Sequence, residues 1–285
     1  MSLSWWPAPA KLNLFLHITG RRADGYHDLQ TAFQLLDWCD EIGIEPTDDG
    51  RIERVAGPSA IAPDADLTVR AARALQSVGA GRSLGVRLSV RKRIPTGGGL
   101  GGGSSDAATV LLVLNRLWGC GLTPAELAAL GLKLGADVPV FVLGSSAWAE
   151  GRGELLSPFE TPERWFVIIH PGVAVSTAEI FQAPELTRNS SLITIRALSE
   201  GRTDQTRNDC ERAVSARYPQ VAAAIEWLAR SAPARLTGTG SCVFASFDTA
   251  AQAERVAARV PDEWTSTVAR GVQRSPLLQS LSALR

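Results

Sequence analysis

The chain has 285 residues, of which 45% are hydrophobic and 20% are charged, as in an ordinary globular protein with a real core. Its 29 basic and 29 acidic residues give a formal net charge of zero, which argues against a general nucleic-acid or membrane surface. No apolar stretch is long enough to span a bilayer, and the length fits two domains better than one.

The N-terminal part of the chain reads mainly as strands. Residues 11–18 alternate strictly and predict a strand. Its two faces carry, respectively, Leu12, Leu14, Leu16 and Ile18, and Lys11, Asn13, Phe15 and His17. The Asp24–Gly25 pair predicts a turn into a second strand over residues 32–38. Helical spacing over residues 66–78 predicts a helix that ends at Gly79, and residues 84–90 alternate as another strand.

Two helices with clear end signals are expected next. The stretch 106–119 holds the first, with Ser104 or Ser105 as its N-cap and Gly119 just beyond its last residue. Residues 123–135 form the second, which opens with a Thr123–Glu126 capping box and has proline at its first position.

The remaining elements suggest a second domain. Residues 137–154 read as strand, turn and strand, and the proline-spaced stretch 155–165 marks the expected domain boundary. Beyond it the pattern predicts strands over 165–172 and 241–247 and helices over 218–231 and 249–260. We find no internal repeat and no low-complexity tract, so the whole reads as two α+β domains.

A glycine-rich loop separates the strand over residues 84–90 from the helix over 106–119. Residues 97–103 hold six glycines, and Ser104 and Ser105 follow them. Glycines let backbone N–H groups converge and let a bulky anion approach closely. The next helix directs its free N–H groups and its positive dipole end at the same place, so the loop predicts a phosphate site.

The loop does not fit the two commonest phosphate-binding motifs. A Walker A loop needs a lysine that is missing here, because two serines follow the last glycine. Gly97, Gly99 and Gly102 match G-x-G-x-x-G, yet no acidic residue about twenty positions on supplies the ribose contact of a Rossmann fold. A flexible linker would not lie between a regular strand and a capped helix.

At this point the sequence resembles the GHMP kinases, named for galactokinase, homoserine kinase, mevalonate kinase and phosphomevalonate kinase. Their second motif is similar to "PTGGGLGGGSSDAA", their N-terminal motif to "PAKLNLFLHITGRRADGYHDLQT", and their third to "LTGTGSCVFASF". "RADGYHDLQT" and "GADVPVF" most resemble the branch whose acceptor is a cytidylated methylerythritol. The likeness is thin between residues 182 and 231. It implies an α/β ATP-binding domain over 1–157, an α+β, ferredoxin-like domain over 158–285, and an active site in the cleft between them.

The resemblance implies an ATP-dependent, Mg²⁺-assisted kinase and gives two residues catalytic roles. Lys11 would stabilise the incoming alkoxide and the γ-phosphate charge, and Asp137 would accept the proton of the acceptor hydroxyl. ATP would lie on Pro95, Gly97, Gly98, Gly99, Leu100, Gly101, Gly102, Gly103, Ser104 and Ser105. The Mg²⁺ ligands are left unassigned; Ser105 and Glu150 are candidates, and the ion can also be held by phosphates and water.

The resemblance also assigns the acceptor site. Tyr26 and Phe181 would stack on the cytosine and His27 would hydrogen-bond its polar edge, with Thr177 nearby. The acceptor would further contact Asn13, on the strand face of Lys11, and Thr239 and Gly240 of the third motif. One departure is Cys210, which stands where the family usually has leucine after an Asn-Asp pair.

Two other functions stay open at the level of sequence. The first keeps the fold and changes the acceptor to mevalonate, homoserine or a sugar, although "ADGYHDLQT" is a feature of the cytidine-binding branch. The second is a nucleotide-binding module without chemistry, which the presence of both Lys11 and Asp137 disfavours. The four cysteines lie far apart and no signal peptide precedes them, so we expect a cytoplasmic protein with reduced cysteines, as monomer or homodimer.

Overall fold

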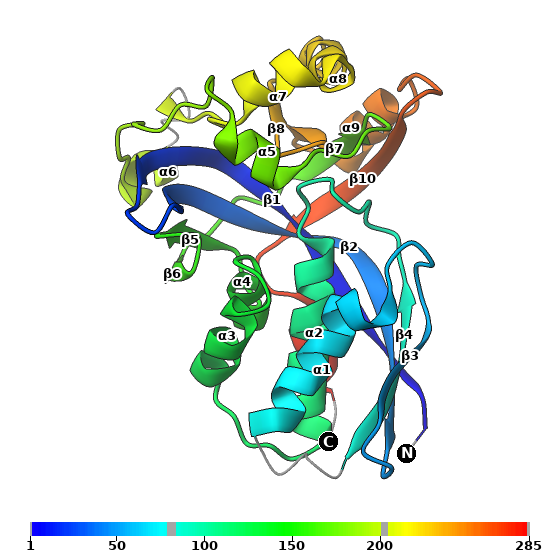
Figure 1. Cartoon of the computed structure of the whole chain (residues 1–285). Coiled ribbons are helices and arrows are strands. Elements are labelled where there is room, and N and C mark those ends of the chain that lie inside the picture. The colour runs from blue at the N-terminus through cyan, green and yellow to red at the C-terminus, as the bar shows by residue number, and fades with distance from the viewer. Residues whose placement is uncertain (1, 79–83, 201–204, 284–285) are drawn as a thin grey trace.

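The computed structural model describes residues 2–78, 84–200 and 205–283 (Figure 1). Its strands are β1 (Ser4–Arg21), β2 (His27–Thr47), β3 (Ile52–Ala56), β4 (Gly85–Arg91), β5 (Ala147–Glu150), β6 (Leu155–Pro158), β7 (Trp165–His170), β8 (Ala234–Leu236), β9 (Val243–Phe247) and β10 (Thr265–Val272). Its helices are α1 (Leu67–Val78), α2 (Gly102–Leu117), α3 (Pro124–Leu132), α4 (Val138–Leu143), α5 (Thr177–Gln182), α6 (Ile195–Ser199), α7 (Glu211–Arg217), α8 (Pro219–Ala229), α9 (Ala250–Ala257) and α10 (Pro276–Ser282), and Pro63–Ala65 forms a short 3₁₀ turn.

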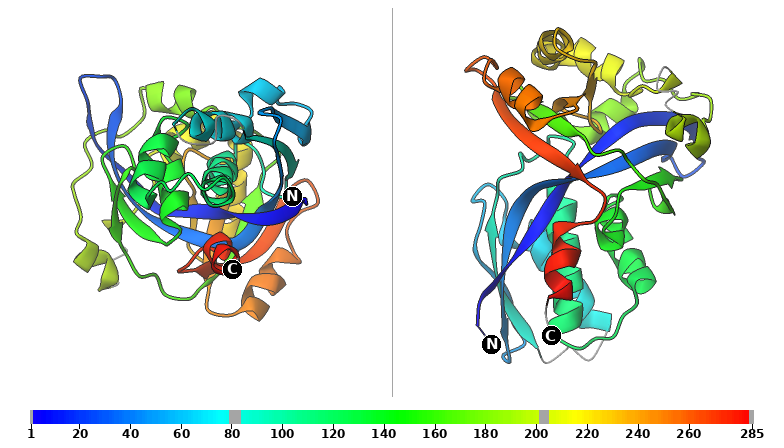
Figure 2. Two further views of the ribbon diagram at one scale, coloured as in Figure 1. Left: turned by 90° about the horizontal axis from the view of Figure 1, so that it is seen from below. Right: turned by 180° about the vertical axis from the view of Figure 1, so that it is seen from behind.

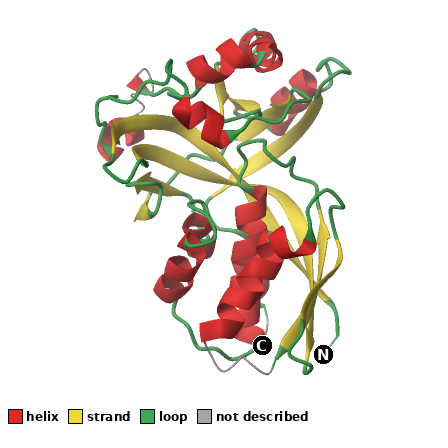
Figure 3. Cartoon of the chain, in the orientation of Figure 1, coloured by secondary structure: helices red, strands yellow, loops and turns green. Residues whose placement is uncertain are grey.

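The molecule has two lobes joined by one long hairpin. In Figures 1 and 3 the helices α1 to α4 lie in one lobe and α7 to α9 in the other, while β1 and β2 run through both. The two strands pair antiparallel with register shifts, one of them between Asn13 and Leu16. Trp6 near the start of β1 belongs to the core of the first lobe, whereas Ile18 near its end belongs to the core of the second. The hairpin therefore fixes the two lobes to each other.

The first lobe packs helices against the strands β2 and β4. Leu111 and Leu114 of α2 and Leu75 of α1 are fully buried against residues of these strands. The end of the chain returns to this lobe, because α10 packs on β1 and Leu277 joins the same core (Figure 2). This buried cluster brings together strand and helix residues that are far apart in sequence, so it holds the first lobe together as one hydrophobic core.

The second lobe is an antiparallel sheet with helices packed on it. Its strands lie in the order β10, β7, β9 and β8, and β10 also pairs with β2 of the hairpin. The helices α8 and α9 pack on this sheet. The two lobes agree with the predicted α+β architecture, and the division at residues 157 and 158 stays a prediction.

One predicted strand is a helix. Residues 138–143 form α4, although the pattern indicated a strand, and the strand of this region begins only at Ala147. Five of its six residues are buried, so apolar and polar residues do not alternate along it. Without such a pattern the sequence cannot distinguish a buried strand from a buried helix. Pro139 in the first turn and Gly144 at the C-cap, in the left-handed region with φ 66°, define its ends.

Several local predictions are confirmed. Thr123 and Glu126 form the capping box of α3, and Gly119 follows α2 with a positive φ of 65°. The expected end of α1 at Gly79 lies outside the described residues. All four cysteines are free, and among the described residues no helix is both long and apolar enough to cross a membrane.

The strand β1 differs from its prediction in length and in the burial of its polar face. His17 is only 2% exposed, and neither ring nitrogen has a hydrogen-bond partner among the described residues. Burial lowers the pKa of His17 below its ordinary 6.5; Asp209 opposes this shift and Arg207 adds to it. The unfolded chain therefore binds a proton that the folded chain disfavours at the same pH.

We expect the contribution of His17 to the free energy of unfolding to fall as the pH drops below 6.5 and to stay constant well above that value. Urea unfolding of the unmodified protein and of His17→Phe, over a pH series on both sides of 6.5, measures the effect. The variant should have the flatter curve. His27 and His170 remain in both proteins, and identical curves would show that His17 does not contribute to the pH dependence.

Candidate active site

The glycine loop leads directly into α2. Gly97, Gly99 and Gly101 adopt positive φ values of 73°, 75° and 71°, a region that side chains with a Cβ rarely occupy. Gly101 is the N-cap, so the prediction of Ser104 or Ser105 as N-cap is wrong. The conformation explains this, because a left-handed glycine already turns the chain into the helix. The first backbone N–H groups of α2 have no partner within the helix and are available to an anion.

The glycine loop also packs against the third glycine-containing motif. Ser241 N donates to Gly97 O at 3.2 Å, Cys242 N to Gly98 O at 3.1 Å, and Thr237 Oγ1 to Gly99 O at 3.2 Å. A Cβ on Gly99 would lie 2.1 Å from the Thr237 carbonyl oxygen. The glycines are therefore needed for two reasons. They allow the left-handed backbone of the loop, and they allow the loop to lie in close contact with the third motif of the other lobe.

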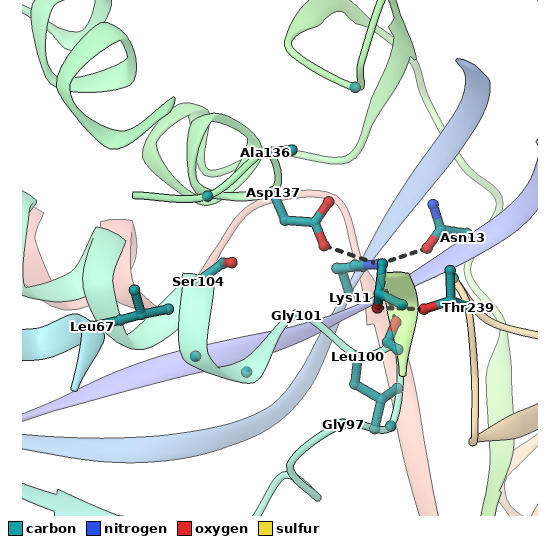
Figure 4. A pocket seen from close by; sticks show the side chains of 18 of the residues that line it. Lys11, Asn13, Leu67, Gly97, Leu100, Gly101, Ser104, Ala136, Asp137 and Thr239 are labelled. Carbon is teal, nitrogen blue, oxygen red and sulfur yellow. Dashed lines mark hydrogen bonds and ion pairs between the residues drawn. The ribbon is translucent and has the colours of Figure 1, made fainter. Parts of the chain in front are cut away.

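Lys11 lies at the centre of the site. Its side chain is 3% exposed, and Nζ donates to Asn13 Oδ1 at 2.6 Å and to Gly99 O at 3.0 Å. Asp137 Oδ2 is 3.3 Å from the same nitrogen. Figure 4 shows the carboxylate of Asp137 and the amide of Asn13 both directed at this ammonium group. One buried cation thus connects the hairpin, the glycine loop and the segment before α4.

Asp137 keeps a carboxylate that is open to a ligand. It immediately precedes α4, and its side chain makes no capping hydrogen bond. The side chain is 33% exposed, in contrast to the buried Lys11. A carboxylate that touches a cation and is also reachable from solvent has the position required of a general base.

A single cavity of about 1110 Å³ contains nearly all of the predicted site residues. They are Lys11, Asn13, Tyr26, His27, Pro95, Gly97, Gly98, Gly99, Leu100, Gly101, Gly102, Gly103, Ser104, Asp137, Thr177, Phe181, Thr239 and Gly240. Ser105 is fully buried and does not line it. Glu150 is also outside the lining and accepts hydrogen bonds from Gln30 at 2.9 Å and Trp148 at 3.2 Å.

Aromatic side chains occupy the end of the cavity nearest the hairpin turn. The His27 and Phe181 rings stack with centroids 5.3 Å apart and an interplanar angle of 21°. Tyr26 is 56% exposed, and the guanidinium of Arg152 lies 4.4 Å from its ring centroid. Thr177 and Thr239 join α5 to the third motif through hydroxyls 2.8 Å apart. The wall combines flat apolar faces with hydrogen-bonding groups, as a nucleobase requires.

The sequence did not reveal a charged cluster beneath the glycine loop. Lys92 Nζ donates to the buried carboxylate of Asp40 and, at 2.8 Å, to Asp106 Oδ2. Asp40 Oδ1 accepts from the backbone N–H groups of Arg93 and Ile94 at 2.6 and 2.8 Å, where the chain enters the loop. Burial raises the pKa of Asp106 above its ordinary value. Asp40, Lys92 and Asp106 are separated in sequence, and no local pattern predicts that their side chains come together.

Comparison with known proteins identifies the family. The GHMP kinases N terminal domain matches residues 66–145, and the GHMP kinases C terminal domain matches residues 185–266. A 4-diphosphocytidyl-2-C-methyl-D-erythritol kinase of Alkalilimnicola ehrlichii is 59% identical over 282 residues, or 98% of this chain and 96% of the relative. The chain belongs to this family of kinases. A Halorhodospira halophila protein of the same name is 55% identical, with the same coverage.

Solved structures agree with membership in the GHMP kinases. A crystal structure of a 4-(cytidine 5'-diphospho)-2C-methyl-D-erythritol kinase matches with a TM-score of 0.81 and 33% identity, over 94% of this chain and all of the other. The mevalonate kinase of Methanococcus jannaschii has the same fold, with a TM-score of 0.68 at 15% identity. The predicted two-domain GHMP fold is confirmed. GHMP kinases use ATP, so the chain is an ATP-dependent kinase.

Proposed function

We propose that this kinase transfers the γ-phosphoryl group of ATP to the 2-hydroxyl of 4-diphosphocytidyl-2-C-methyl-D-erythritol. The products are the 2-phosphate and ADP, and the step belongs to the non-mevalonate (MEP) route to isoprenoid precursors. The observation that carries the proposal is the 3.3 Å contact of Lys11 and Asp137 in a cavity shared with the glycine loop and the His27–Phe181 pair. The proposal places phosphate-binding, proton-accepting and base-binding groups around one space.

The glycine loop and the start of α2 would hold the phosphates of ATP. Backbone N–H groups and the positive end of α2 offset the phosphate charge, and the Ser104 hydroxyl lines the same space. Among the described residues no three His, Cys, Asp or Glu side chains cluster as a metal site. We therefore infer that Mg²⁺ is held mainly by the phosphate oxygens of ATP and by water. Ser104 lines the part of the cavity where these phosphates would bind. When bound, the ion neutralises phosphate charge.

Lys11 and Asp137 would carry out the chemistry. Asp137 accepts the proton of the acceptor hydroxyl, and the Lys11 ammonium stabilises the negative charge that develops on the attacking and transferred oxygens. Asn13 and Gly99 hold Lys11 in place through the two hydrogen bonds to its Nζ. Phosphoryl transfer requires mainly positioning and charge neutralisation, so these groups suffice.

Tyr26, His27 and Phe181 would bind the cytosine, and Thr177, Thr239 and Gly240 would line the path of the acceptor between base and phosphates. All six lie in the lining of the cavity.

We also propose that residues 1–157 form the ATP-binding domain and residues 158–285 the substrate-side domain. ATP use and four free cysteines support a cytoplasmic location.

His27→Ala is expected to raise KM for the cytidylated acceptor about tenfold or more. The substitution removes the imidazole ring, which both forms hydrogen bonds and stacks on Phe181. KM for ATP should stay within about twofold, since the glycine loop is untouched. Steady-state kinetics with each substrate varied in turn measures both values. His170→Ala, which removes a histidine outside the cavity lining, is the matched control. An unchanged acceptor KM would show that His27 does not bind the base.

A coupled ADP-release assay with ATP, Mg²⁺ and a panel of acceptors tests the function. The panel holds 4-diphosphocytidyl-methylerythritol, methylerythritol phosphate, mevalonate, homoserine and galactose. We expect turnover with the cytidylated acceptor alone. Turnover of another acceptor in preference would overturn the substrate assignment, and ATP binding without turnover of any acceptor would favour a binding module.

A further inference from the structure

Arg188 makes four hydrogen bonds at the base-binding end of the cavity. Its Nε donates to His27 Nε2 at 3.2 Å and its Nη1 to Leu186 O at 3.1 Å. Its Nη2 donates to Phe181 O at 3.0 Å and to Ala183 O at 2.8 Å. One side chain therefore joins the hairpin residue His27 to the end of α5, which carries Phe181. Arg188 lies in the stretch 182–231, where the likeness to the family motifs is thin, and the resemblance assigns it no role.

The chemistry of the guanidinium group determines the state of the histidine. A guanidinium is always charged and only donates, so the nitrogen that faces it must offer a lone pair. His27 Nε2 is that acceptor, and the ring proton consequently lies on Nδ1. A second proton would place an N–H against the Arg188 N–H. Burial lowers the pKa of His27 below its ordinary 6.5, and the charges of Arg188 and Arg21 lower it further.

The same side chain also sets the position of the stacked pair. Phe181 and Ala183 lie at the last turn of α5 and just beyond it, where helix carbonyl groups lack partners in the helix. Arg188 supplies the donors for these two carbonyls while it holds the His27 ring that stacks on Phe181. The orientations of the two rings are thereby coupled through one guanidinium.

We propose that Arg188 is a positioning residue that holds His27 neutral, with its proton on Nδ1, and fixes the His27–Phe181 wall for the acceptor's nucleobase. The proposal rests on the function proposed above, since it specifies how that site recognises cytosine. In this state His27 offers an N–H donor from Nδ1, and cytosine carries the acceptors N3 and O2 that a donor can meet. Arg188 acts through His27 and takes no part in phosphoryl transfer.

The test combines histidine NMR with kinetics. The chain has three histidines, so long-range ¹H–¹⁵N correlation spectra of ¹⁵N-histidine protein can be assigned by single substitutions. In the unmodified protein His27 should show the Nδ1–H tautomer. In Arg188→Met we expect loss of that single tautomer and a rise in the His27 pKa toward its ordinary value. KM for the cytidylated acceptor should rise about tenfold, with kcat and KM for ATP within about twofold.

Arg217→Met is the matched control. Arg217 donates to Glu185 Oε2 at 2.7 Å and lies 3.7 Å from Glu179, so it anchors the same segment without a bond to His27. It should leave the His27 tautomer and the acceptor KM unchanged. Arg188→Leu, which likewise removes the charge and all the hydrogen-bond donors of the side chain, should behave like Arg188→Met and replaces it if the methionine variant does not fold.

The two proposals fail in different ways. An unaltered His27 tautomer in Arg188→Met and in Arg188→Leu, or an equal rise of KM in Arg217→Met, would overturn the role of Arg188 while the kinase function stood. If the unmodified enzyme did not phosphorylate the cytidylated acceptor, the proposed function would fall, and the NMR comparison would still decide whether Arg188 sets the state of His27.

Discussion

Asp137→Asn is expected to lower kcat by about 10²–10⁴-fold while ATP binds nearly as well as before. The substitution keeps the size of the side chain and removes its ability to take a proton. Asp137 makes no capping bond and is 33% exposed, and the side-chain oxygen of asparagine can still contact Lys11, so we expect the variant to fold. Lys11 retains its bonds to Asn13 and Gly99, which leaves the phosphate end of the site in place.

The measurement pairs single-turnover kinetics with calorimetric titration of ATP. Asp64→Asn is a suitable control, because that aspartate is 81% exposed, pairs with Arg73 and does not line the cavity. It removes the same charge and should change neither kcat nor ATP affinity. If Asp137→Asn turned over normally, Asp137 would have no part in proton transfer, whatever its distance from Lys11.

Much of the site could be predicted because its residues stand in short, dense patterns. The glycine loop, its two serines and the helix behind it adjoin in sequence, so local rules for helix starts and glycine conformations already predict a phosphate site. Lys11 and Asn13 share a strand face for the same local reason. The structure adds that the Lys11 ammonium group binds the loop itself, through the Gly99 carbonyl oxygen.

The parts that could not be predicted depend on contacts between distant residues. Lys92 meets Asp40 of the neighbouring strand, and Arg188 meets His27, which is 161 residues away in sequence. No periodicity encodes such pairs. The sequence of α4 predicts a strand because a helix that is buried on all sides shows no helical period of apolar and polar residues. A short buried helix is recognised only from its end residues, and here these were Pro139 and Gly144.

Gly99→Ala is expected to destabilise the protein by about 2–5 kcal/mol and to abolish measurable ATP binding. Two costs add. The residue has a φ of 75°, which an L-side chain adopts with difficulty, and its Cβ would lie 2.1 Å from the carbonyl oxygen of Thr237. That oxygen belongs to the backbone and cannot move aside as a flexible side chain would. The loop must separate from the third motif, and the phosphate-binding N–H groups lose their arrangement.

Two further glycine variants separate the two costs, with chemical unfolding and ATP titration as the readouts. Gly97→Ala has the positive φ of 73° but meets only the Ala174 methyl at 3.6 Å, so it should lose about 1–2 kcal/mol. Gly103→Ala has neither a positive φ nor a contact nearer than Leu67 at 3.4 Å, and because this position is helical its stability should equal or slightly exceed that of the unmodified protein. Equal losses for Gly97 and Gly99 would mean that conformation alone selects glycine in this loop. The larger loss expected at Gly99 arises because the ATP loop and the third motif are in direct backbone contact.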